Sequence, residues 1–358
     1  MKRKKVIGSI FLMGLLLIGC ATDRSANRGP EKIIVQVESS EKYDVLLVER
    51  LRALEQSISD LRSEVVDLGD RLRNIHARPP LTTYKLPQEV YLCGERVPIE
   101  DRNVWENLDR EFLLALENEA QVLLWMKRAK RYFPYIEKRL KEMDLPDDLK
   151  FLAITESSLR PYAISPTGAS GIWQFIPSTG GKYGMRRNRT IDERFDFFKA
   201  TEGALTYLKS LYEEFGSWAL SMAAYNAGEN RVRKEIELQK TKNYFYLDLP
   251  METERYVYKI ALAKIILSDP QRLGFHLEAN EFYDPLQVER VQIELAQPLP
   301  IMDVARAIGS YYKEVKEMNL HLSEETIPAG IHFLNLPPGT SDRFWTFFST
   351  WKKELECK

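Results

Sequence analysis

The chain has few of the side chains that bind metal ions or build disulfide frameworks. Its 358 residues include three cysteines and four histidines, and no histidine has metal-ligand spacing with a cysteine. We therefore expect neither a metal site nor a cofactor. The charge is nearly balanced, with 51 basic and 52 acidic residues, so the excess of positive charge typical of nucleic-acid-binding proteins is absent. The length and composition are those of a soluble globular protein with room for two domains.

Long apolar runs are also scarce. Residues 6–18 are apolar but too short to span a bilayer comfortably, and four basic residues precede them, which is the pattern of a secretory leader. The leader ends in Leu-Ile-Gly-Cys20, which resembles the lipobox of bacterial lipoproteins. This resemblance implies a lipoprotein signal peptide over residues 1–19 and an acylated Cys20, and Ala21 is compatible with an anchor on the periplasmic face of the outer membrane. The alternative is a plain signal peptide with an incidental cysteine.

The two other cysteines, Cys93 and Cys357, lie far apart in the sequence. In an oxidising compartment they could form a disulfide, provided that their Cα atoms come within bridging distance. The sequence leaves this pairing open.

A heptad pattern follows the leader. Residues 20–40 are mostly polar and indicate a flexible tether. Within residues 41–76, apolar residues then alternate steps of four and three: Leu47, Leu51, Leu54, Ile58, Leu61, Val65, Leu68, Leu72 and Ile75. This pattern predicts a coiled-coil helix that forms a homo-oligomer, packs on a partner helix or folds back on its own domain, and we favour the homo-oligomer. Residues 77–103 are expected to be a linker, and residues 81–98 within it could instead form a short extended arm.

One acidic residue, Glu156, occupies a position that favours its protonated form. Pro146 and two aspartates after it mark a helix start, and Leu149, Leu152, Ala153 and Glu156 fall on one helical face. Loss of water and the negative end of the helix dipole both raise the pKa of a carboxyl group, which can then act as a general acid near neutral pH. The alternative is a helix-terminal glutamate that points to solvent.

The segment after Glu156 combines small polar residues with aromatic ones. Residues 157–171 form a loop rich in serine and glycine, and Trp173, Gln174 and Phe175 follow. Such a loop lets backbone approach a ligand, while an indole ring and an amide are groups that can bind a sugar. At least one of the two aromatic rings is expected to lie in the core.

Three motifs follow one another in this half of the chain. They are Glu156-Ser157, the run Ser-Pro-Thr-Gly-Ala-Ser-Gly-Ile-Trp-Gln-Phe over 165–175, and Ala-Tyr-Asn-Ala-Gly over 224–228. Together they resemble the lytic murein transglycosylases of the goose-lysozyme-like group. The Trp-Gln-Phe variant, Asp-Glu-Arg at 192–194 and the run 252–257 are closest to the membrane-bound D type. The resemblance implies a mainly α, lysozyme-like (SLT) catalytic domain, which we place at residues 104–275.

The resemblance also implies a set of site residues. Glu156 is the catalytic residue, and the substrate-binding residues are Ser165, Gln174, Tyr225, Asn226 and Tyr256. In this group Tyr225 or Asn226 helps to hold the catalytic carboxyl group and the substrate, and Tyr256 hydrogen-bonds the catalytic glutamate. On periodicity alone, both tyrosines could be core residues and Asn226 a helix cap.

The pattern between residues 104 and 269 predicts about seven helices and no strand, with clear boundaries at 198–215, 218–227 and 251–267. After residue 285 the pattern of apolar residues changes from helical to mixed. A strand at 288–295, helices at 301–310 and 312–318, and a strand at 332–337 resemble a LysM module, a small α+β glycan-binding fold, over residues 286–340. The alternative is a degenerate module that only packs on the catalytic domain. A C-terminal helix lies within residues 341–358.

The implied activity is cleavage of the β-1,4 bond between N-acetylmuramic acid and N-acetylglucosamine in peptidoglycan, in cell-wall remodelling. No water enters, and the product carries a 1,6-anhydro ring. Glu156 alone would serve as acid and then as base, although Glu193 or Glu254 could also lie close in space. Two alternatives stay open: a goose-type lysozyme that hydrolyses the bond, and a non-catalytic peptidoglycan-binding scaffold lipoprotein.

Overall fold

The computed structural model describes residues 41–74 and 81–356. The leader, Cys20 and the tether lie outside the described residues, as does Cys357. The chain divides into two units, Met1–Ile75 and His76–Lys358. In the first unit the heptad pattern forms one helix, α1 (Glu41–Asn74), as the sequence predicts.

The second unit contains a β-hairpin that the sequence pattern does not predict. Within the stretch predicted to be a linker, β1 (Val90–Leu92) and β2 (Glu95–Val97) form an antiparallel hairpin in which Val90 lies opposite Val97. Both valines and Leu92 are buried in the main hydrophobic core. Residues 90–97 are therefore part of the folded unit and not a linker, because their alternate side chains are needed to complete the core.

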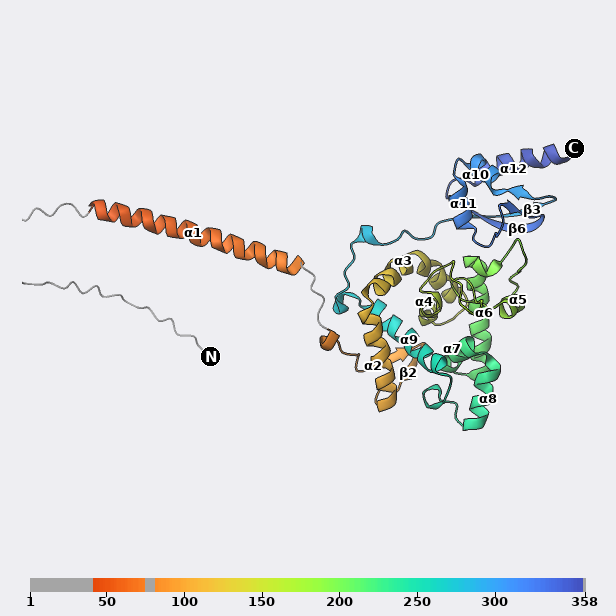
Figure 1. Cartoon of the computed structure of the whole chain (residues 1–358), viewed down its shortest axis with the longest axis horizontal. Helices are drawn as coiled ribbons and strands as arrows, with labels where there is room; N and C mark the ends of the chain where they lie inside the picture. Colours follow the sequence, from red (N-terminus) through yellow and green to blue (C-terminus); the bar gives the residue numbers. More distant parts are fainter. Residues whose placement is uncertain (1–40, 75–80, 357–358) are drawn as a thin grey trace, which may run out of the picture. The chain divides into compact units, whose positions relative to one another are not determined.

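Helices make up most of residues 102–268 (Figure 1). They are α2 (Arg102–Glu117), α3 (Glu119–Glu142), α4 (Leu152–Ser157), α5 (Pro177–Lys182), α6 (Phe197–Phe215), α7 (Trp218–Ala227), α8 (Glu229–Gln239) and α9 (Met251–Ser268). The predicted boundaries of α6, α7 and α9 hold to within one residue. The mainly α fold class is confirmed.

Helix α7 lies at the centre of this arrangement. It packs against α6, α8 and α9, and its residues from Trp218 to Ala224 are all buried. Four of its ten residues are alanine, and small side chains let neighbouring helix backbones approach closely. This close packing brings the C-terminal end of α7 to the same region as α4 and α9.

The C-terminal module (residues 286–340) has its own core. Strand β3 (Glu289–Leu295) pairs antiparallel with β6 (Gly330–Leu336), with Val291 opposite Leu334. Between them lie α10 (Ile301–Ile308) and α11 (Tyr312–Met318), together with the short pair β4 (Leu299–Pro300) and β5 (Thr326–Ile327). The βααβ order matches the prediction. Helix α12 (Ser341–Glu356) follows, and Phe344 and Phe348 from it complete the module's core.

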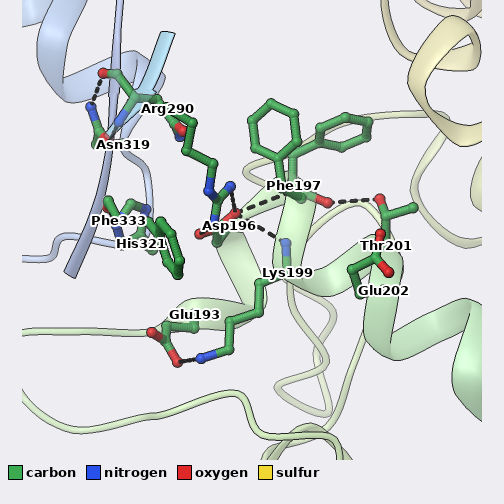
Figure 2. A network of polar contacts seen from close by, with 12 residues as sticks. Glu193, Asp196, Phe197, Lys199, Thr201, Glu202, Arg290, Asn319, His321 and Phe333 are labelled. Atoms are coloured by element: carbon green, nitrogen blue, oxygen red, sulfur yellow. Dashed lines mark hydrogen bonds and ion pairs between the residues drawn. The ribbon is translucent and has the colours of Figure 1, made fainter. Parts of the chain in front are cut away.

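A buried ion pair joins the C-terminal module to the helical domain. Arg290 on β3 donates to both carboxylate oxygens of Asp196, at 3.0 and 2.8 Å. Asp196 is also the N-cap of α6 and accepts from the backbone of Phe198 and Lys199. The guanidinium of Arg290 lies over the rings of Phe198 and Phe333, 4.8 and 4.7 Å from their centroids. Figure 2 shows this arginine reaching from the module to the start of α6.

Backbone contacts extend the same interface. The N–H of Asp192 donates to the carbonyl of His321, and the N–H of Ser323 donates to the carbonyl of Thr190. An exposed pair between Arg189 and Glu324 lies beside them at 2.7 Å. The module is therefore fixed to the segment that precedes α6.

The two ion pairs across this interface provide a matched test. We expect Arg290→Ala to lower the free energy of unfolding by about 2–4 kcal/mol, because it leaves the carboxylate of Asp196, only 3% exposed, without its cation. Arg189→Ala removes a pair whose arginine is 81% exposed and should cost less than about 0.5 kcal/mol. Denaturant unfolding of both variants measures the difference. Equal losses would show that the Arg290 pair does not hold the module.

Candidate active site

A pocket of about 460 Å³ opens beside α4, α7 and α9. Its lining includes every catalytic and substrate-binding residue that the sequence predicts: Glu156, Ser165, Gln174, Tyr225, Asn226 and Tyr256. Its size is within the range of small-molecule and cofactor sites. The fold thus brings together residues separated by as many as 100 positions in the sequence.

The position of Glu156 is set by a short helix. Residues Asp147–Phe151 form a 3₁₀ turn that leads into α4, so the predicted helix is present but tighter in its first part. Leu149, Leu152 and Ala153 are buried, which confirms the apolar stripe. The helix ends one residue after Glu156, where Ser158 adopts the left-handed conformation and its N–H donates to Ile154.

The carboxyl group of Glu156 is largely enclosed by protein and opens to the pocket. The hydroxyl of Tyr256 donates a hydrogen bond to its Oε1. Burial raises the pKa of Glu156 to about 8, and the nearby Glu252 carboxylate acts in the same direction. The hydrogen bond from Tyr256 and the charge of Lys259 oppose this shift by stabilising the carboxylate. Glu156 therefore keeps its proton at neutral pH and can give it up within the pocket.

Three neighbouring polar groups are held in fixed orientations. Burial and the charge of Glu156 raise the pKa of Tyr256 well above its usual value, so its hydroxyl stays a donor. Tyr225 donates to the carbonyl of Trp173 at 2.8 Å. Thr253 donates to Oδ1 of Asn226 at 2.9 Å, which leaves the amide hydrogens of Asn226 available to a ligand in the pocket.

The glycine-rich loop is held against a buried arginine. Arg194 donates to the carbonyls of Gly168 and Phe175, at 2.7 and 2.9 Å, and pairs with Asp192. Gly171 has φ +82°, and a Cβ there would lie 2.0 Å from the carbonyl oxygen of Arg194. Only glycine fits at this position, so the loop can follow the arginine closely.

Glu193, which the sequence leaves as a candidate second acid, has a structural role. Its carboxylate pairs with Arg186 and Lys199, and although burial opposes ionisation, hydrogen bonds from these two cations lower its pKa to about 2. It does not line the pocket. Glu193 is thus a fixed anion in the segment that supports the loop.

The ring of Trp173 does not face the pocket, so the prediction that it could bind a sugar is wrong. Trp173 is fully buried and donates from Nε1 to Thr201, so it offers no face to a sugar. Phe175 is also buried, although it borders the pocket. The prediction that at least one ring lies in the core is correct. Gln174 donates to the carbonyls of Gly171 and Ala163, which leaves its amide oxygen as an acceptor.

Several pocket residues were not identified from the sequence. They are Thr155, Tyr207, Glu229, Glu252 and Lys259. Two of them had a detectable signal, because Glu252 and Lys259 lie four residues before and three residues after Tyr256 on α9 and so share its helical face. Tyr207 and Glu229 are hydrogen-bonded to each other at 2.9 Å. Their contact depends on α6 and α8 both packing against α7 and has no local sequence signature.

The sequence around this pocket is similar to those of known proteins. The family model of the transglycosylase SLT domain matches residues 133–247. The chain is 34% identical over 222 residues to membrane-bound lytic murein transglycosylase D of Escherichia coli K12, which covers 60% of this chain and 48% of that protein. It is 31% identical over 120 residues to membrane-bound lytic murein transglycosylase C of Actinobacillus succinogenes, covering 29% of this chain and 33% of that protein. The chain thus spans about half of the length of the first relative and a third of the second.

Among solved structures, the 70 kDa soluble lytic transglycosylase of Escherichia coli superimposes with a TM-score of 0.33 and 22% identity, over 49% of this chain and 32% of that chain. The assignment rests on the sequence matches and not on this superposition. The region that contains Glu156 and the glycine-rich loop matches the family model of the transglycosylase SLT domain, and its sequence is similar to those of membrane-bound lytic murein transglycosylases.

Proposed function

We propose that this protein cleaves the β-1,4 bond between N-acetylmuramic acid and N-acetylglucosamine in peptidoglycan without using water, as a lytic transglycosylase. The observation that carries the proposal is the enclosed carboxyl group of Glu156, with a pKa of about 8, beside the hydroxyl of Tyr256 in one pocket. A carboxyl group that is protonated at neutral pH and easily ionised can serve first as an acid and then as a base.

In the first step, Glu156 gives its proton to the glycosidic oxygen as the bond from that oxygen to C1 breaks. The N-acetylglucosamine product leaves with the proton on its hydroxyl group. The positive charge on the muramoyl ring is met by the substrate's own N-acetyl group. In the second step, the Glu156 carboxylate takes the proton of the C6 hydroxyl while O6 bonds to C1 and closes the anhydro ring. Glu156 ends the cycle protonated, so no second acid is required.

The other pocket residues would bind and orient the glycan. Tyr256 stabilises the Glu156 carboxylate between the two steps through its hydrogen bond. The amide groups of Gln174 and Asn226 present an acceptor and donors to the N-acetyl groups and hydroxyls of the sugars. Ser165 and Tyr225 complete the set, and both border the same pocket.

A hydrolytic goose-type lysozyme is the second candidate. Glu229 and Glu252 line the pocket together with Glu156, and a hydrolase that follows the common mechanism needs a second carboxylate. A non-catalytic scaffold is the third, and the raised pKa of Glu156 speaks against it, because a pocket carboxyl group that is protonated at neutral pH has the property that a general acid requires.

We further propose that the protein is held in the cell envelope by a lipid on Cys20. The relatives are named membrane-bound, and no helix in the described part of the chain is long and apolar enough to cross a membrane. Residues 1–19 would be the signal peptide and residues 20–40 the tether. The anchor would lie on the periplasmic face of the outer membrane.

We also propose a supporting role for the C-terminal module. Its LysM-like βααβ order suits a glycan-binding fold. Its contacts with residues 190–196, the segment from which Arg194 holds the glycine-rich loop, favour the alternative in which it packs on the catalytic domain. Helix α1, which belongs to neither the catalytic domain nor the C-terminal module, would associate with another helix.

We expect Glu156→Gln to reduce release of soluble muropeptides from purified sacculi by about 10³-fold or more, because the amide can neither give nor take the proton. The folded state of the native protein binds a proton at Glu156 more tightly than the unfolded chain does, so its stability falls as pH rises between about 4.5 and about 8.

Glu156→Gln has no carboxyl group to ionise, so its folded state does not lose stability as the pH rises through this range. The variant should be more stable than the native protein by about 1–2 kcal/mol at pH 8, with a smaller difference at pH 5. Thermal unfolding at both values tests this. A variant that unfolds earlier at pH 8 would show that Glu156 is not an enclosed acid, and one that still releases muropeptides would exclude its catalytic role.

Mass spectrometry of the products separates the two enzymatic candidates. Transglycosylation should yield muropeptides with a 1,6-anhydro ring, each lighter by one water than the product of hydrolysis. The expected result is the anhydro series alone. If the hydrolytic series predominates, the protein is a lysozyme and one of the additional pocket carboxylates acts on water.

Two substitutions should move the pH profile in opposite directions. Tyr256→Phe removes the hydrogen bond that stabilises the carboxylate and should raise the pKa of Glu156. The alkaline limb of the pH profile of kcat/KM should then shift to higher pH, and the maximum rate should fall. Glu252→Gln removes a nearby negative charge and should shift that limb downward. Rates on sacculi between pH 5 and 10 measure both. Shifts of the same sign would contradict the assignment of the limb to Glu156.

A further inference from the structure

Helix α1 carries an apolar stripe that the described residues do not cover. Its members are Leu47, Leu51, Leu54, Ile58, Leu61, Val65 and Leu68, which we call the heptad face. Their side chains are between 51% and 66% exposed. At about 1.5 Å per residue the stripe is roughly 30 Å long. A continuous apolar surface of this kind marks an interaction site.

The residue types on the heptad face select a partner geometry. Steps of four and three place Leu47, Leu54, Leu61 and Leu68 at the d positions of successive heptads. The a positions between them hold Leu51, Ile58 and Val65. Leucine at d with β-branched residues at a favours two parallel strands over higher oligomers, and two of these three a positions, Ile58 and Val65, hold β-branched residues. The face therefore fits one other helix in parallel orientation.

The charges beside the heptad face are complementary to those of an identical helix. In a parallel pair, a g position lies across from the e position of the next heptad on the partner. Arg50 at g then faces Glu55 at e of the second copy, and symmetry gives this attraction twice. The next two pairs, Ser57 with Arg62 and Glu64 with Gly69, contain no like charges.

We propose that α1 pairs in parallel with α1 of a second copy of this chain, so that the protein is a dimer through its N-terminal helix. The orientation places both N-terminal segments at the same end, which lets two copies be anchored in one membrane if the lipid on Cys20 proposed above is present. In each copy, the catalytic unit follows α1 in the sequence. The dimer itself requires neither the lipid nor the activity of Glu156.

Sedimentation equilibrium of the purified protein tests the assembly. The expected result is twice the mass of the chain. Leu54→Lys combined with Leu61→Lys puts charges at two d positions and should give a monomer. The matched control, Gln56→Lys with Ser63→Lys, adds the same charge at f positions on the outer face and should stay a dimer. A monomeric native protein, a trimer, or equal effects of the two double variants would overturn the proposal.

Cysteine cross-linking tests the orientation. Cys20, Cys93 and Cys357 are first replaced by alanine, and Leu51→Cys at an a position or Leu68→Cys at a d position is then introduced. In a parallel dimer each variant alone should form a disulfide-linked dimer under mild oxidation, since a residues face a residues and d residues face d residues. Cross-linking only in a mixture of the two variants would show an antiparallel pair. Muropeptide release by the same proteins is measured separately, so failure of the enzymatic proposal and failure of the dimer are distinguishable.

Discussion

The site depends on one contact between distant parts of the chain, the hydrogen bond from Tyr256 to the carboxyl group of Glu156. Enclosure raises the pKa of Glu156, whereas the tyrosine stabilises the ionised form. These opposing effects leave the group protonated at neutral pH and still able to ionise. Both require α4 and α9 to lie close together, which the small residues of α7 and the dense helical core allow.

A second constraint acts on the other wall of the pocket. The glycine-rich loop has little side-chain bulk of its own to hold its shape, and it takes that shape from Arg194 and from the close approach at Gly171. The segment containing Arg194 is in turn bonded to the C-terminal module through backbone contacts and through Arg290 on Asp196. We propose that the module supports the pocket from a distance, through buried charges that each have a partner.

Much of this arrangement could be predicted from local sequence. The apolar stripe that ends at Glu156 and the limits of α7, between Trp218 and a glycine, are properties of neighbouring residues, and the structure agrees with both. The six site residues were identified through motif resemblance, and they line one pocket. The hairpin at 90–97 was missed because three-residue strands are too short to show a period and are stabilised by burial in the helical core.

Other features could not be derived because they depend on long-range packing. Trp173 is adjacent to a pocket residue in sequence, yet its ring turns into the core, where Thr201 accepts its hydrogen bond. The bond between Arg290 and Asp196 joins residues 94 positions apart, and neither has a local signal for the other. The sequence therefore predicts which residues form the site better than it predicts what holds them in place.

The central claim is that the carboxyl group of Glu156 is a protonated acid at neutral pH. It is measured most directly by NMR titration of carboxyl-¹³C-labelled glutamate, with the Glu156 resonance assigned by its loss in Glu156→Gln. The account predicts that this resonance titrates with a pKa of about 8. A midpoint near 4.5, the ordinary value for glutamate, would contradict it.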